Sequence, residues 1–304
     1  MQLDIHFLGT GGSWPSVNRN VSAIAIKRGH EVLLFDCGEG TQRQLQRSAL
    51  SYMQISKIFI SHFHGDHFLG LPGFFQTIQL NERKEPLYVF GPRGIKKLIG
   101  QLLDLGYFAP SYEIRVGEVN DGDVLFFDGY RIKVLAVCHN IPCLAYCFEE
   151  DSRPGKFHKK KALALGIPEG PLFNKLQKGL IVEVKGKKIV PSDVMGEPRP
   201  GRKITITGDT RPCDNLIGFA HKSDVLIHDS TFDSSIEPKA NEYGHSTAQQ
   251  AAEIAKKAGV KKLFLVHISP RYKDGKLLEE DAKKVFQQSY VTHDFMVAEV
   301  RYRN

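Results

Sequence analysis

The first part of the chain consists of short apolar runs separated by glycines and polar turns, a pattern that predicts β-strands. Runs of this kind predict strands at Leu3–Leu8, Ala23–Lys27, Val32–Phe35 and Lys57–Ser61. Later runs of the same kind predict strands at Arg131–Val137, Ala145–Glu149, Lys203–Thr207, Val225–His228 and Lys262–Ile268.

Apolar residues at helical spacing occur between these runs and predict helices at Thr41–Leu50, Gly94–Leu105 and Ser246–Lys257. Ser246 or Thr247 can cap the last of these helices, and Gly259 is suited to end it. Strands and helices are mixed rather than strictly alternating. We therefore expect an α+β fold in which helices cover the sheets.

One segment, residues 150–202, departs from this pattern because glycine, proline and lysine dominate it. It includes the run Gly166-Ile167-Pro168-Glu169-Gly170-Pro171. Such a composition is typical of a loop rather than of a core element. We predict a single domain over residues 1–304, with residues 150–202 as an inserted, flexible arm that projects from it.

The composition is that of a globular protein, with 41% hydrophobic and 25% charged residues among 304. No apolar stretch reaches the ~20 residues of a membrane span, and the first residues do not resemble a secretory signal. Five cysteines, an odd number, favour a reducing compartment, and we expect the cytoplasm. Cys143 and Cys147 could form a metal pair, but two buried thiols are the favoured interpretation.

Positive charge is concentrated in one segment. The chain carries a net charge of +7, and Ser152–Val194 alone has ten basic and three acidic residues, which also gives +7. A local excess of this kind indicates either a polyanion-binding surface or a solvated lysine-rich face. Charge alone does not distinguish a polyanion-binding surface from a solvated face.

The densest chemistry lies directly after the strand predicted at Lys57–Ser61. His62, His64, Asp66 and His67 fall within six residues. Imidazole and carboxylate groups are ligands that Zn²⁺ prefers. The alternating His62 and His64 place both rings on one side of an extended backbone, and the turn at Gly65 can direct Asp66 and His67 to a second ion. This run can therefore start two adjacent metal sites.

Three further candidates follow other predicted strands in the same way. His139 comes after Arg131–Val137, Asp209 after Lys203–Thr207 and Gly208, and His267 near the end of Lys262–Ile268. Taken singly, each of the three is more often a structural residue. Together with the first motif they predict a shared metal site.

The order of these motifs resembles the metallo-β-lactamase superfamily, in which an αββα sandwich holds a binuclear centre. The resemblance covers nearly the whole chain. It implies that His62, His64 and His139 bind one ion and that Asp66, His67 and His267 bind the other. Asp209 would bridge the two ions, which we expect to be Zn²⁺.

Other motifs are similar to those of the short-form ribonuclease Z family, which trims the 3′ end of precursor tRNA. They are Phe7–Gly12, Pro15–Asn20, Thr207–Pro212, Gly244–Thr247 and Ser269–Tyr272. The arm with Gly170 and Pro171 resembles that family's tRNA-binding exosite. Two positions depart from the family. Val17 replaces a lysine in the loop associated with sensing the CCA end, and Asp229 replaces a glutamate.

The resemblance implies a zinc-dependent endoribonuclease that leaves a 3′-hydroxyl on the tRNA and a 5′-phosphate on the trailer. Asp66 would accept a proton from water, and His245, oriented by Asp229, would protonate the leaving oxygen. The expected substrate contacts are Arg19, Gly170, Pro171 and Arg271, and the expected assembly is a homodimer. A small-substrate hydrolase would leave the basic segment unexplained. A catalytically silent RNA-binding protein would leave the proton donor unexplained.

Overall fold

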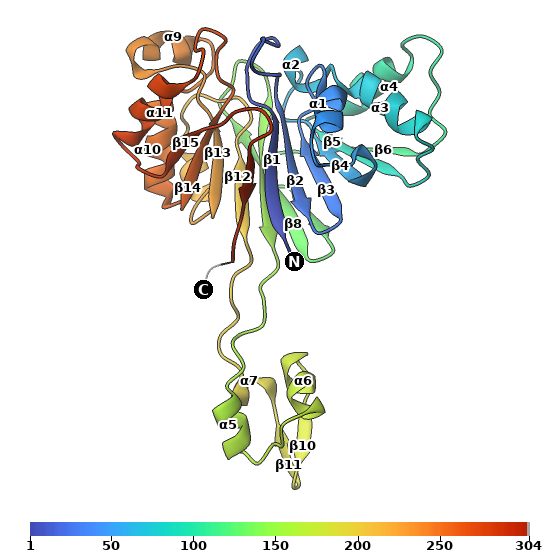
Figure 1. Ribbon diagram of the computed structural model, residues 1–304, viewed down its shortest axis with the longest axis vertical. Coiled ribbons are helices and arrows are strands. Elements are labelled where there is room, and N and C mark those ends of the chain that lie inside the picture. Colours follow the sequence, from blue (N-terminus) through green and yellow to red (C-terminus); the bar gives the residue numbers. More distant parts are fainter. Residues whose placement is uncertain (303–304) are drawn as a thin grey trace. The chain divides into compact units, whose positions relative to one another are not determined.

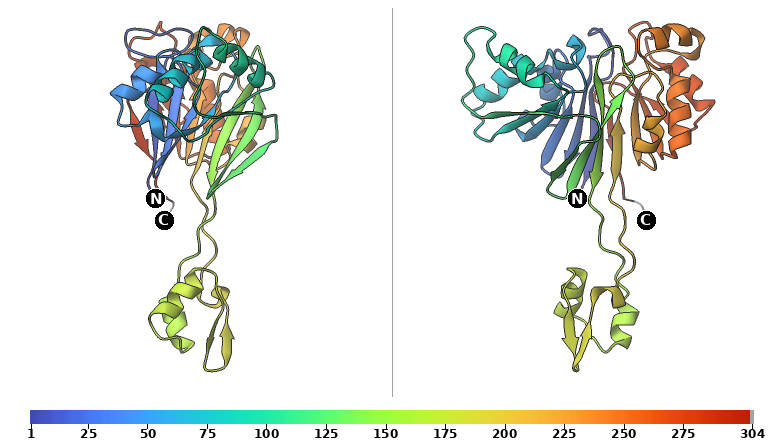
Figure 2. Two further views of the ribbon diagram at one scale, coloured as in Figure 1. Left: turned by 90° about the vertical axis from the view of Figure 1, so that its right-hand side faces the viewer. Right: turned by 180° about the vertical axis from the view of Figure 1, so that it is seen from behind.

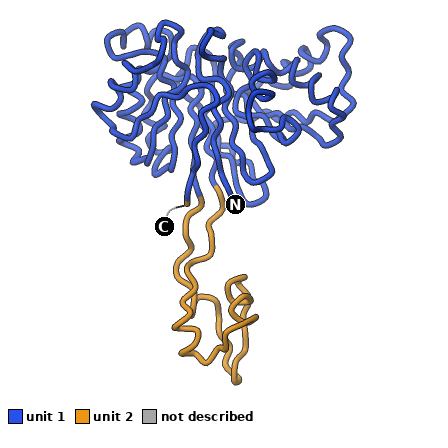
Figure 3. The backbone as a smooth tube through the Cα atoms, viewed as in Figure 1, with its two compact units in different colours: residues 1–149, 202–301 blue, residues 150–201, 302–304 orange. Residues whose placement is uncertain are grey.

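The computed structural model describes residues 1–302, which form two compact units (Figure 3). The large unit comprises residues 1–149 and 202–301. The small unit comprises residues 150–201 together with Tyr302. Among the described residues, no helix has both the length and the apolar character that crossing a membrane requires.

Two seven-stranded sheets form the centre of the large unit (Figure 1). The first has the order β16 (Val297–Glu299), β1 (Leu3–Gly9), β2 (Ala23–Arg28), β3 (Glu31–Phe35), β4 (Ile55–Phe59), β5 (Leu87–Gly91) and β6 (Ile114–Glu118). The second has the order β15 (Ser289–Val291), β14 (Lys262–Val266), β13 (Val225–Asp229), β12 (Lys203–Ile206), β9 (Cys143–Glu150), β8 (Tyr130–Val137) and β7 (Val124–Phe127).

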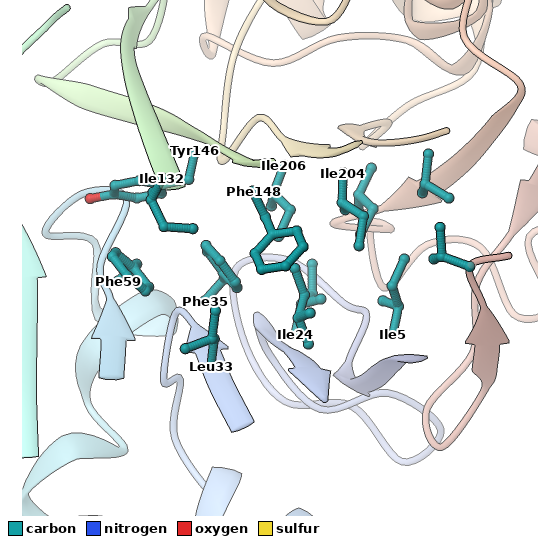
Figure 4. Packing of buried hydrophobic residues seen from close by; sticks show 14 of the residues in the cluster. Ile5, Ile24, Leu33, Phe35, Phe59, Ile132, Tyr146, Phe148, Ile204 and Ile206 are labelled. Atoms are coloured by element: carbon teal, nitrogen blue, oxygen red, sulfur yellow. The ribbon is translucent and has the colours of Figure 1, made fainter. Parts of the chain in front are cut away.

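The inner faces of the two sheets pack against each other through a continuous apolar core (Figure 4). Phe35 and Phe59 from the first sheet stack at 5.0 Å between ring centroids, and Tyr146 from β9 packs on both rings. Alternate residues along each strand supply this core, as the period of two in a strand requires. Burying a large apolar side chain stabilises the fold by about 1.5–3 kcal/mol.

Helices cover the outer face of each sheet (Figures 1 and 2). The first sheet is covered by α1 (Thr41–Arg47), α3 (Leu71–Leu80) and α4 (Ile95–Leu103), and the second by α8 (Asn215–Phe219), α10 (Ala248–Ala258) and α11 (Lys276–Lys283). The other helices of the large unit are α2 (Gly65–Phe68), α9 (Glu237–Glu242), η1 (Tyr52–Gln54) and η2 (Ser234–Ile236). The predicted αββα sandwich is confirmed.

Two predicted helix ends show how local chemistry sets boundaries. Thr247 caps α10 by accepting the N–H of Gln250, and Gly259 ends it in the left-handed region with φ 63°. The helix predicted at Thr41–Leu50 is shorter than expected. It ends at Arg47 because Ser48 adopts an extended backbone, with φ −96° and ψ 172°.

The small unit has a core of its own. It contains α5 (Lys159–Ala164), α6 (Pro171–Gln177), the hairpin β10 (Val182–Val184) and β11 (Lys187–Ile189), and α7 (Pro191–Val194). Its buried side chains are Ala162, Ile167, Leu176, Val182, Ile189 and Val194. In the sequence this unit lies between β9 and β12, which pair antiparallel with Glu149 opposite Lys203.

Strand direction brings the candidate residues of the large unit to one edge. Strands β12, β13 and β14 are mutually parallel, so their carboxyl ends share an edge of the second sheet. Gly11, just beyond β1, forms a parallel bridge with Ile268, just beyond β14. This bridge ties the corresponding edges of the two sheets together, and the polar cluster described below lies there.

Candidate metal centre

The seven side chains predicted as metal ligands lie together in the large unit. Each lies on or next to the segment that leaves the carboxyl end of a strand, with His62 to His67 after β4, His139 after β8, Asp209 after β12 and His267 after β14. Their nitrogen and oxygen atoms fall into groups in which all atoms lie within 4.8 Å of one another.

One group joins three imidazoles to Asp209. Nδ1 of His64 lies 3.0 Å from Nε2 of His62 and 3.2 Å from Nε2 of His139. A second group contains Asp66, His67 and His267. There, Oδ2 of Asp66 lies 3.6 Å from Nε2 of His67 and 3.3 Å from Nε2 of His267.

Asp209 lies between the two groups. Its Oδ2 atom is 3.6 Å from Nε2 of His62, 3.3 Å from that of His67 and 3.2 Å from that of His267. The carboxylate is 2% exposed. Burial acts to raise its pKa, but the surrounding imidazoles of His267, His67 and His62 outweigh burial and hold the pKa well below its usual value. A buried anion in contact with both groups has the geometry of a bridging ligand.

The partners of the histidine rings fix which nitrogen faces the cluster. Nδ1 of His139 lies 2.8 Å from the Gly244 carbonyl oxygen, and Nδ1 of His67 lies 2.7 Å from a carboxylate oxygen of Asp36. Both oxygens only accept hydrogen bonds, so both Nδ1 atoms carry the proton.

The same reasoning applies to the other two rings through hydroxyl groups. The Ser61 hydroxyl donates to Asp36, so it accepts from Nδ1 of His62 at 2.9 Å. The Thr231 hydroxyl donates to Asp229, so it accepts from Nδ1 of His267 at 2.9 Å. In neutral rings, Nε2 therefore presents a lone pair toward the cluster in all four cases.

These lone pairs favour a cation. Nε2 of His67 is buried, and no hydrogen-bond partner is found for it among the described residues. Burial acts to lower the pKa of His67, but the nearby carboxylates of Asp209 and Asp36 hold that pKa well above its usual value. The surroundings of His67 therefore stabilise a positive charge, which a metal ion can supply. The nitrogen and oxygen donors fit Zn²⁺ in number and type.

Several supporting residues were not predicted. Asp36 leaves β3 with φ 58° and accepts from the Ser61 N–H at 2.7 Å, from the Ser61 hydroxyl and from His67. It follows an apolar strand, the same signal that pointed to Asp209. Ser61 and Thr231 carry no comparable signal, because isolated hydroxyl residues are common in every part of a chain.

The segment after β1 is fixed to the same cluster. The Ser13 N–H donates to Oδ2 of Asp66 at 2.7 Å. A Cβ atom on Gly12 would lie 2.4 Å from Cε1 of His267, so only glycine allows this approach. His267 itself has φ 60°, a strained conformation for a histidine, and it directs the ring toward Asp209.

A histidine–carboxylate pair adjoins the cluster. Nδ1 of His245 lies 2.8 Å from Oδ2 of Asp229, which also accepts the Thr210 N–H at 3.0 Å. Asp229 is fully buried, and its other oxygen accepts two hydrogen bonds from Thr231. Burial acts to lower the pKa of His245, but the carboxylate outweighs it and raises that pKa to about 9. The carboxylate of Asp229 therefore favours the protonated form of His245.

A cavity of about 630 Å³ opens onto this assembly. Asp66, Asp209 and His245 line it, together with Arg271, whose guanidinium lies 4.9 Å from the centre of the Phe232 ring. Arg19, an expected substrate contact, is not part of the cavity lining. It is buried, and its guanidinium donates to the Thr10 hydroxyl at 2.8 Å and to the Thr292 carbonyl at 2.5 Å. Gly170 and Pro171 begin α6 in the small unit.

Comparison with known proteins extends over the whole chain. The β-lactamase superfamily domain matches residues 191–268, and the anti-Pycsar protein Apyc1 family matches residues 3–112. Ribonuclease Z of Methanosarcina acetivorans is 49% identical over 302 residues, which cover 99% of both chains. Ribonuclease Z of Methanothermobacter thermautotrophicus is 46% identical over 299 residues, or 98% of this chain and 97% of that protein.

Solved structures show the same fold. The human tRNase Z short form superposes with a TM-score of 0.72 at 30% identity, covering 98% of this chain and 99% of that one. The metallo-β-lactamase fold protein YhfI of Bacillus subtilis also superposes with a TM-score of 0.72, over 98% of this chain and 99% of its own, at 19% identity. The second likeness shows the metallo-β-lactamase fold alone.

Proposed function

The chain belongs to the ribonuclease Z family, and from that premise we propose how its site cuts precursor tRNA. It is a metal-dependent endoribonuclease, a phosphodiester hydrolase that processes the 3′ end of tRNA. The observation that links this function to particular residues is that they share one cavity. Asp66, Asp209 and His245 line it, and the buried Asp229 contacts His245 at 2.8 Å.

We propose that the cluster binds two zinc ions. Seven candidate ligands are too many for one tetrahedral site, and Asp209 contacts both groups of ligands. When bound, the two ions would activate a water molecule for attack and offset the negative charge that develops on the phosphoryl group.

The protein's own groups then have distinct tasks. Asp66, fixed by the Ser13 N–H and facing the cavity, takes the proton of the attacking water. The bond from the water oxygen to phosphorus forms as the bond from phosphorus to the ribose 3′-oxygen breaks. His245, held protonated by Asp229, gives its proton to that 3′-oxygen. The products are a tRNA with a 3′-hydroxyl and a trailer with a 5′-phosphate.

Asp229 fills the role of the glutamate that the family usually has at this position. The loss of one methylene does not prevent contact, since the carboxylate lies 2.8 Å from His245. Four hydrogen bonds, from Thr210, Thr231 and His245, hold it in one orientation. We therefore propose that Asp229 orients the imidazole and stabilises its charged form.

The small unit is proposed to bind the body of the tRNA. Its nine lysines are all solvent-exposed, on α5, α6 and the β10–β11 hairpin and next to them. One of them, Lys159, pairs with Glu169 at 2.7 Å. Exposed lysines on a separately packed unit suit contact with a phosphate backbone, which gives affinity without reading sequence. Gly170 and Pro171 would belong to this surface.

The assembly and location of the enzyme are further proposals. A homodimer would let the small unit of one subunit hold a tRNA that the partner subunit cuts. The metal ligands all lie outside residues 150–201, so such a division of labour leaves each centre complete within one chain. A cytoplasmic location is supported by the five cysteines, whose thiols are all free.

Labelled precursor tRNA tests this function. The wild-type protein should release the trailer and leave a 3′-hydroxyl. The His245→Ala variant should lose about 10²–10⁴-fold in kcat, because general acid catalysis is typically worth that much, while its affinity for the tRNA stays near that of the wild type. Weakened affinity with unchanged turnover would instead assign His245 to phosphate contact.

A matched pair of lysine variants tests the small unit. Lys160→Gln with Lys161→Gln removes two exposed charges near the start of α5, and Lys96→Gln with Lys97→Gln removes two from α4. The first pair should weaken tRNA binding and lower the slope of log affinity against log salt by up to about two units, since each phosphate contact contributes about one. Equal effects of the two pairs would contradict a dedicated binding unit.

A further inference from the structure

The only tryptophan of the chain lies in the wall of the cavity that holds the metal cluster. The side chain of Trp14 is 62% exposed. Single exposed apolar residues are common on protein surfaces, so exposure alone means little. The position is informative, because the ring opens into the same space as Asp66, Asp209 and His245.

The residues before Trp14 fix the position of its backbone relative to the metal cluster. The preceding residue, Ser13, donates its N–H to Asp66 and has φ 72°. Gly12 packs directly on the ring of His267, and the Trp14 N–H donates to the Gly12 carbonyl at 2.9 Å. The backbone that carries the indole is therefore fixed, one residue away, to Asp66, the proposed proton acceptor and metal ligand.

The lining of the cavity includes other flat or apolar side chains. Tyr243 and Leu69 also line it, with exposed fractions of 48% and 51%. A phosphodiester group is charged and does not stack on such surfaces. The bases of unpaired nucleotides stack on them, because every base has a π-face that packs against an aromatic ring.

We propose that Trp14 is a specificity-determining residue, whose indole stacks on the base of a nucleotide adjoining the scissile phosphate. This inference rests on the proposed function, since it requires an RNA strand in the cavity. Stacking holds that nucleotide in the cavity in the bound substrate and in the transition state alike, so it adds affinity for the RNA strand. It also favours unpaired RNA, whose bases are free to stack.

Fluorescence gives a direct measurement, because a single tryptophan reports one position. The His245→Ala variant, which should bind precursor tRNA but cut it about 10²–10⁴-fold more slowly, keeps most of the substrate intact during a rapid titration. Its tryptophan emission should be strongly quenched at saturating tRNA. Two further substrates each lack the base of one nucleotide, either the one before or the one after the scissile bond. One of these two substrates should leave most of the tryptophan emission unquenched. Unchanged emission at saturation would overturn the proposal.

Kinetics provide the second measurement. Trp14→Ala should raise KM about 10-fold with kcat nearly unchanged, a change of ~1.4 kcal/mol, which is within the range of base–aromatic stacking. Trp14→Phe should retain most of the affinity. Tyr107→Ala, which removes an exposed aromatic ring outside the cavity lining, serves as the control and should behave as the wild type.

The effects of removing the ring and removing the base should not add. The test uses the abasic substrate that restores the emission. On this substrate the Trp14→Ala variant and the wild-type protein should have the same kcat/KM, because the substitution and the missing base each remove the same stacking contact. Full additivity would overturn the proposal. A wild-type protein that does not cut precursor tRNA would overturn the proposed function itself. Normal cleavage by both the wild type and Trp14→Ala would overturn only the stacking role.

Discussion

Replacing Asp36 by asparagine should weaken zinc binding although Asp36 is not among the proposed ligands. The carboxylate accepts three hydrogen bonds, from the Ser61 N–H, the Ser61 hydroxyl and Nδ1 of His67. Asparagine tolerates the backbone φ of 58° and has nearly the same shape. It has one acceptor oxygen instead of two, so its amide N–H₂ would face the N–H of His67.

The magnitude follows from the tautomer that Asp36 imposes. With two donors face to face, the His67 proton would move from Nδ1 to Nε2, the atom that lies among Asp209 and Asp66. A protonated Nε2 cannot bind a metal. Losing a hydrogen bond to a charged group costs about 1.5–3 kcal/mol, or roughly 10- to 150-fold in affinity. That range agrees with the 10–100-fold typical for groups that orient metal ligands.

The assay is zinc affinity, measured by competition with a chromophoric chelator. Asp281→Asn is the matched control, because Asp281 is also buried and also accepts an N–H and a hydroxyl, both from Ser234, at 2.8 and 2.9 Å. Both variants should lose stability, but only Asp36→Asn should lose zinc affinity. An Asp36→Asn protein with wild-type zinc affinity would refute the tautomer argument.

Two other predictions concern the same centre. Because Asp229 raises the pKa of His245 to about 9, turnover should fall as the pH rises above that value and the proton is lost. In Asp229→Asn, the largest effect that opposes burial and raises the pKa of His245 is removed, so the pH–kcat profile should fall at a lower pH. An unshifted profile would show that Asp229 does not set the protonation of His245. Chelation should abolish cleavage and added zinc restore it, with about two equivalents of metal per chain in the wild type and less in Asp66→Ala. Saturation at one equivalent would contradict a binuclear centre.

The sandwich and the clustered side chains could be predicted from the sequence because both leave local signals. Each candidate ligand follows an apolar strand, and parallel strands end at a common edge, so residues far apart in the chain meet. Helix α3 was not predicted. Gly70, Pro72 and Gly73 obscure its start in the sequence, and its formation depends on burying Phe74 and Phe75 against the first sheet.

Arg19 shows what a local motif leaves undetermined. Arg19 is an expected substrate contact, and that role stays a prediction. In the structure its guanidinium donates to the Thr10 hydroxyl and to the Thr292 carbonyl. The partner at Thr292 is 273 residues away in the chain, so nothing near Arg19 reveals it. Ser61 and Thr231 escaped prediction for a similar reason, since their importance lies in which histidine nitrogen they contact.

The way in which the small unit is inserted has an evolutionary consequence. The chain leaves the second sheet after Glu149 and returns at Lys203, and these two residues are paired partners on adjacent antiparallel strands. Closing a loop between ends that the sheet already holds together costs little more when the loop lengthens, since the entropy grows only with the logarithm of its length. Segments of different size and charge can be exchanged at this point while the strand register that positions Asp209 stays the same. A segment exchanged there would leave all seven proposed metal ligands in place, since each of them lies outside residues 150–201.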